Sequence, residues 1–65
     1  MIIDIDYIGT KKDAIFDSEQ YGIEITLVEC DQAIALIKGT KDKLKSFLVQ
    51  HHYGDEQEVN EIYFQ

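Results

Sequence analysis

Two similar segments divide this chain, and their repetition constrains the fold more than any other feature. Residues 9–22 read GTKKDAIFDSEQYG, and residues 39–54 read GTKDKLKSFLVQHHYG. Each segment begins with Gly-Thr-Lys, ends with Tyr-Gly, follows an isoleucine-rich stretch and precedes another stretch that we expect to be extended. The repetition therefore predicts two copies of a strand–helix–strand unit, joined one after the other.

The apolar spacing of the extended stretches agrees with this order. Residues 2–8 and 22–29 alternate apolar and polar side chains, which is typical of half-buried strands. Residues 33–38 are almost wholly apolar and predict a central strand, with a turn at Cys30 and Asp31 before it. Residues 58–64 complete the pattern as a last strand.

The two segments between these strands predict helices. Residues 40–53 place Leu44, Phe47, Leu48 and His51 at i, i+3, i+4 and i+7, and Gly54 ends this helix. Residues 10–20 predict a shorter helix, in which Thr10 is the N-cap and Asp13 stands three residues later.

The resulting prediction is an α+β domain with the ferredoxin-like split βαβ plan, βαββαβ. It has a four-stranded antiparallel sheet with both helices on one face. Right-handed crossovers place the first and third strands in the middle, and we take these two strands to be parallel. The alternative is a four-stranded sheet with a single helix at about 40–53. With 65 residues, no proline and no linker, residues 1–65 form a single domain.

Charge excludes several classes of partner. The chain has 13 acidic residues, 6 lysines, no arginine and a formal net charge of -7. Direct nucleic-acid binding and binding to anionic membranes both require basic groups, so we expect neither. No stretch is long and apolar enough to span a membrane, no secretion signal is recognisable and there is one cysteine, so we expect a cytoplasmic protein.

The acidic residues predict a protein-binding surface on the open face of the sheet. If the isoleucines of the strands point towards the helices, carboxylates and one tyrosine gather on the opposite face. Such a surface suits a basic protein partner. The predicted protein-binding residues are Asp4, Asp6, Glu24, Glu61 and Tyr63.

An alternative site lies at the two Gly-Thr-Lys loops. In the predicted fold both loops leave the ends of adjacent central strands, so we expect them side by side. Each loop begins a helix, whose free N–H groups attract anions. This alternative predicts a small-anion or phosphate site formed by Thr10, Lys11, Lys12, Thr40, Lys41 and Lys43.

The sequence contains no catalytic signature and indicates no cofactor. Adjacent histidines such as His51 and His52 point about 100° apart on a helix and do not chelate one metal ion easily. Compared with other split-βαβ families, the chain lacks the phosphate-binding arginine of acylphosphatases and the CxxC loop of copper carriers.

We therefore expect a small, acidic, non-enzymatic binding or regulatory protein that docks on a basic protein. A phage or mobile-element inhibitor of a nucleic-acid-acting protein would fit this description. The remaining alternatives are the anion-sensing module described above and a structural homodimer that pairs through sheet faces or edges.

Overall fold

Three strands and three helices follow one another in the computed structural model, which describes residues 1–29 and 34–64. The α+β class is confirmed. The predicted turn at Cys30 and Asp31 lies outside the described residues, as does Ala33 at the start of the predicted central strand. The elements in chain order are β1 (Ile2–Asp6), α1 (Lys11–Tyr21), β2 (Glu24–Glu29), β3 (Ile34–Lys38), α2 (Lys41–Gln50) and α3 (Glu56–Tyr63).

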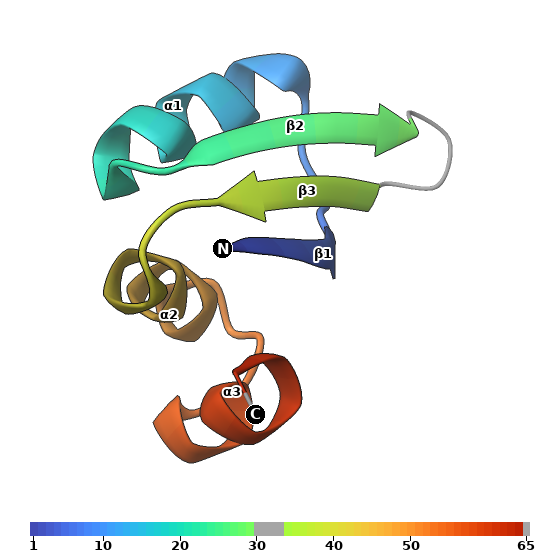
Figure 1. Cartoon of the computed structure of the whole chain (residues 1–65). Coiled ribbons are helices and arrows are strands. Elements are labelled where there is room, and N and C mark those ends of the chain that lie inside the picture. The colour runs from blue at the N-terminus through green and yellow to red at the C-terminus, as the bar shows by residue number, and fades with distance from the viewer. Residues whose placement is uncertain (30–33, 65) are drawn as a thin grey trace.

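The sheet has the strand order β1-β3-β2, and β3 is antiparallel to both of its neighbours (Figure 1). The predicted parallel arrangement of the first and third strands is therefore wrong. The reason is topological. β1 and β2 run in the same direction on either side of β3, and because β2 is antiparallel to β3, β1 is antiparallel to β3 as well. The predicted fourth strand is also wrong, and so is the alternative with a single helix.

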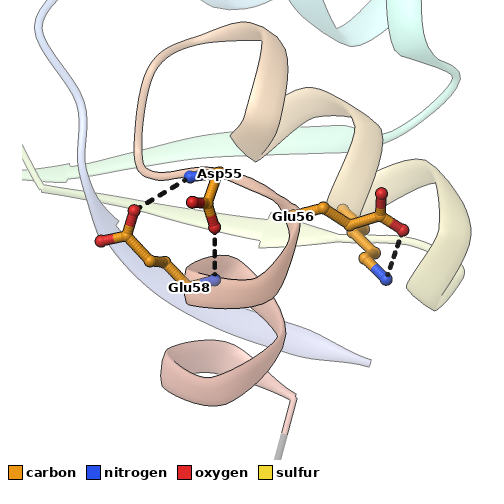
Figure 2. Close-up of polar contacts among 4 residues, drawn as sticks. Asp55, Glu56 and Glu58 are labelled. Atoms are coloured by element: carbon orange, nitrogen blue, oxygen red, sulfur yellow. Dashed lines mark hydrogen bonds and ion pairs between the residues drawn. The ribbon is translucent and has the colours of Figure 1, made fainter.

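The residues predicted as the last strand form α3 because a capping box starts a helix there. The Glu58 backbone N–H donates to Asp55 Oδ1 at 2.8 Å, and the Asp55 N–H donates to Glu58 Oε1 at 3.4 Å, as Figure 2 shows. These two bonds satisfy backbone groups that a helix otherwise leaves free at its start. Glu56, in the first turn, pairs with Lys45 of α2 at 3.2 Å. Val59 is then buried on the inner side of the helix.

The two predicted helices exist, and their ends are set by local backbone bonds. Thr10 and Asp13 form the predicted capping box of α1, and Gly22 ends that helix in the left-handed conformation, with φ of 66°. In α2 the helix ends earlier than predicted, at Gln50. His52 takes the left-handed position with φ of 64°, and the next residue, Tyr53, donates its N–H to the Leu48 carbonyl. This is the bonding of a Schellman motif, so His52 occupies the position we assigned to Gly54.

One hydrophobic core lies between the sheet and the helices. Ile5, Ala35 and Ile37 face this core from the strands, and every helix contributes at least one buried side chain. Phe47 is completely buried at its centre, and its ring lies 5.3 Å from Tyr21 and 4.5 Å from His51 between centroids. The helices contribute to one core on the side of the sheet to which Ile5, Ala35 and Ile37 point, whereas Ile2, Asp4, Glu24 and Thr26 on the other side are exposed. None of the helices described is long and apolar enough to cross a bilayer.

Candidate protein-binding site

The open face of the sheet is built by every second residue of the three strands. Ile5 pairs with Ala35 and both point into the core, so their neighbours along each strand point away from it. The register aligns Asp4 with Leu36 and Leu36 with Thr26 across the three strands. The open face consists of Ile2, Asp4 and Asp6 from β1, Ile34, Leu36 and Lys38 from β3, and Glu24 and Thr26 from β2.

Exposed carboxylates stand on both outer strands of the open face. Asp4 and Asp6 are exposed on β1 and Glu24 on β2, and among the described residues of this face Lys38, at the end of β3, is a cation that stands directly across from Glu24. Leu36, between them on the central strand, is half-buried. The structure thus places three of the five residues predicted to bind a protein on one face of the sheet. Ile34 and Leu36 of β3 lie between the outer strands, and we call these two residues the apolar strip.

The other two predicted residues, Glu61 and Tyr63, do not belong to the open face. Both lie on α3, because the segment predicted as a strand is helical. Tyr63 nevertheless approaches the same region from the side. Together with Asp4, Ile5, Asp6 and Ile34 it borders a hollow of about 240 Å³. Glu61 is exposed and accepts a hydrogen bond from Gln57 on its own helix.

The two Gly-Thr-Lys loops lie at opposite ends of the sheet, which contradicts our expectation that they are adjacent. The antiparallel register places Asp6, at the end of β1, beside Ile34, at the beginning of β3. The loop after β1 and the loop after β3 are therefore separated by the length of β3, which is roughly 13 Å. Thr10, Lys11 and Lys12 form one group, and Thr40, Lys41 and Lys43 form another.

The first of these groups already has an anion of its own. The Asp13 carboxylate accepts hydrogen bonds from the Thr10 N–H at 2.8 Å and from the Thr10 hydroxyl at 3.1 Å. These bonds hold the pKa of Asp13 below its usual range. A carboxylate at a helix N-terminus also interacts favourably with the helix dipole. The start of α1 is thus occupied by a side chain of the chain itself.

The second group lies around a hollow of about 510 Å³ at the start of α2. Thr40 caps this helix by accepting a hydrogen bond from the Lys43 N–H at 3.4 Å. Lys38 and Lys41 also border the hollow, as does Met1. Anion binding at the start of α2 stays a prediction. It now involves three of the six residues predicted for this site, which are Thr40, Lys41 and Lys43.

A cleft that we did not predict lies between α1 and the loop from α2 to α3. Its volume is about 530 Å³. Tyr7 at its base is buried, and its hydroxyl donates to Asp17 Oδ2 at 2.6 Å. His51 Nε2 lies 3.8 Å from the other carboxylate oxygen of Asp17. Two exposed apolar side chains, Ile8 and Phe16, stand at the rim.

Burial and the bond to Asp17 raise the pKa of Tyr7 far above its usual value, so this hydroxyl keeps its proton at alkaline pH values where an ordinary tyrosine ionises. Burial also raises the pKa of Tyr53, whose hydroxyl donates to the backbone carbonyl of Asp6. Both hydroxyls are therefore engaged in joining separate elements. The cluster of Tyr7, Asp17 and His51 connects the residue after β1, helix α1 and the C-cap of α2.

One signal for this cluster is present in the sequence, namely the i, i+4 spacing of Phe47 in α2 and His51 at its C-cap. The position of Asp17 beside them depends on how α1 crosses the sheet and has no local signal. Among residues 1–29 and 34–64, no group of three or more His, Cys, Asp and Glu side chains is arranged to hold a metal ion.

Comparison with known proteins adds no relative. The chain matches no protein-family model, no curated protein and no solved structure at a significant level.

Proposed function

We propose that this chain is a small, acidic, non-enzymatic binding protein that docks the open face of its sheet on a basic surface of another protein. The observation that carries the proposal is the arrangement of exposed Asp4, Asp6 and Glu24 around the apolar strip at Leu36. An apolar centre with a charged rim is the usual composition of a protein–protein interface.

Exposed apolar groups on the same face support docking of a protein rather than of a small ion. Ile2 on this face is 62 % exposed, and Val28, where the register of β2 shifts, is 50 % exposed. A partner that covers them gains hydrophobic free energy, at about 25 cal/mol for each Å² removed from water. The carboxylates add orientation, since a wrongly placed partner would leave them without counter-charges.

The overall charge favours the same class of partner. A net charge of -7 on 65 residues attracts a basic protein over distances set by the ionic strength and repels other acidic proteins. A basic groove that otherwise holds nucleic-acid phosphates is one surface of this kind. An inhibitor that occupies such a groove is the specific role we propose.

The test is capture of partners from a lysate of the source cells, with the wild-type chain and a charge-reversed variant compared side by side. The variant is Asp4→Lys with Glu24→Lys, and elution uses a salt gradient followed by mass spectrometry. We expect the wild type to retain a basic protein that elutes at moderate salt, and the variant to lose it. Titration of the purified partner should then show weaker binding at higher salt.

A matched control has the same change in net charge at another place. Glu19→Lys with Glu61→Lys reverses two exposed carboxylates on α1 and α3, away from the open face. This control should retain the partner. Equal loss in both variants would indicate a response to net charge alone, and retention of the partner by Asp4→Lys with Glu24→Lys would refute the proposal.

A further inference from the structure

The outer edge of β1 carries backbone groups without partners among residues 1–29 and 34–64. The Gly39 N–H donates to the Met1 carbonyl at 3.2 Å, which fixes the phase of the ladder between β1 and β3. Residues of an antiparallel strand alternate between bonding to their neighbour and pointing away from it. Ile3 and Ile5 therefore bond to β3, while the N–H and C=O groups of Ile2 and Asp4 point outwards.

The two edges of the sheet differ in how well they are protected. The register between β2 and β3 shifts between Leu27 and Glu29, as it does at a β-bulge, and α1 packs against β2. Bulges disturb the regular spacing that a new strand requires. β1 pairs with β3 in one continuous register, the Asp6 carbonyl accepts a hydrogen bond from the Tyr53 hydroxyl, and Tyr63 of α3 lies beside Asp4 and Asp6. The edge from Ile2 to Asp4 is thus regular, and the side chains of Ile2 and Asp4 are exposed.

We propose that β1 accepts an extended segment of the basic partner as an additional strand, with lysine or arginine at alternate positions of that segment. This inference rests on the proposed function and specifies its partner. In such a pairing, every second side chain of the segment lies on the open face beside Asp4 or Asp6. Opposite charges on neighbouring strands attract each other, so alternate basic residues match this edge.

The same charges argue against a second copy of this chain as the occupant. Full antiparallel overlap of two β1 strands would place Asp4 beside Asp4 of the other copy, and like charges directly across a strand pair are destabilising. A hollow of about 240 Å³ is bordered by Asp4 and Asp6 of β1, by Ile34 of β3 and by Tyr63. It offers space for a long basic side chain, and the Tyr63 ring offers a face for a cation.

The experiment uses the full chain and a short synthetic peptide in which lysine alternates with valine and threonine. The control peptide has the same composition with its lysines in one block. We expect tighter binding of the alternating peptide and slower hydrogen exchange at the amides of Ile2 and Asp4 in its presence. The amide of Ile3, which already bonds to β3, should change little. Equal binding of both peptides, or unchanged exchange at Ile2 and Asp4, would overturn the inference.

Two variants separate strand addition from docking by charge alone. Ile2→Pro removes one outward N–H without changing any charge, at the first position of an edge strand, where proline is tolerated. It should lower the affinity for the alternating peptide about fivefold, which is the effect of one lost hydrogen bond. The control Ile2→Ala should lower this affinity less. Asp4→Asn keeps the N–H and removes the charge, and should also weaken binding.

The outcomes distinguish the two proposals. If Asp4→Asn weakens binding while Ile2→Pro behaves like Ile2→Ala, docking by charge stands and strand addition fails. If neither variant matters, both proposals fail at this surface. Protection of the Ile2 and Asp4 amides without peptide, increasing with protein concentration, would identify a second copy as the occupant and overturn the inference.

Discussion

Removal of the Tyr7 hydroxyl is a sharp test of how this small core is held together. The side chain is only 4 % exposed, and its hydroxyl donates to the Asp17 carboxylate at 2.6 Å. A hydrogen bond to a charged partner contributes about 1.5–3 kcal/mol to stability. Tyr7→Phe keeps the ring against Phe47, so we expect the free energy of unfolding to fall by about 2 kcal/mol. That is a large part of the roughly 3–10 kcal/mol expected for a domain of this length.

Urea denaturation followed by circular dichroism at neutral pH measures this loss. A double-mutant cycle with Asp17→Asn isolates the pair, and we expect a coupling of about 1–2 kcal/mol. Tyr63→Phe is the control, because the described residues offer its hydroxyl no hydrogen-bond partner. A loss below about 0.5 kcal/mol for Tyr7→Phe, or strict additivity in the cycle, would refute the reasoning.

The raised pKa of Tyr7 adds a pH dependence with a definite sign. Its main cause is burial, followed by the bond to Asp17, and the usual value for tyrosine is 10.0. Above pH 10 the unfolded state loses this proton while the folded state keeps it, so stability should fall as the pH rises. The slope for one group is up to about 1.4 kcal/mol per pH unit. Tyr7→Phe should show a shallower decline, and equal slopes in both proteins would contradict the assignment.

Three further substitutions test the rest of the fold. Phe47→Ala empties the centre of the core and should cost about 3–5 kcal/mol, enough to leave the chain largely unfolded by circular dichroism. Asp55→Ala removes the cap of α3 and should cost about 1 kcal/mol in urea denaturation, whereas the neighbouring Glu56→Ala should cost less. Gly22→Ala should cost about 1 kcal/mol because φ is 66° there, and a melting temperature equal to that of the wild type would contradict this.

The starts of the helices were readable from the sequence where the capping residues lie close together. Thr10 and Asp13 form the capping box that their spacing predicts, and the helix that follows is present. The same spacing exists at Asp55 and Glu58, but our prediction for residues 58–64 was a strand. That choice was wrong because a capping box and a buried Val59 favour a helix over a strand that lacks strict alternation.

The candidate site was predictable only where the predicted secondary structure was right. Alternation along β1 and β2 correctly assigned Asp4, Asp6 and Glu24 to the face opposite the core. Glu61 and Tyr63 were misplaced together with the element that carries them. The bond from Tyr7 to Asp17 joins residues ten positions apart on different elements, and no pattern in the sequence indicates it.

The sequence by itself determined which side chains of each strand share a face and where α1 and α2 begin, because both depend on neighbours within four residues along the chain. Only the tertiary structure decided the order β1-β3-β2, the separation of the two Gly-Thr-Lys loops and the open outer edge of β1. These features depend on the direction in which distant strands pair. That direction is settled by burying Phe47 and its neighbours under one face of the sheet, a free energy summed over the whole chain rather than over any one segment.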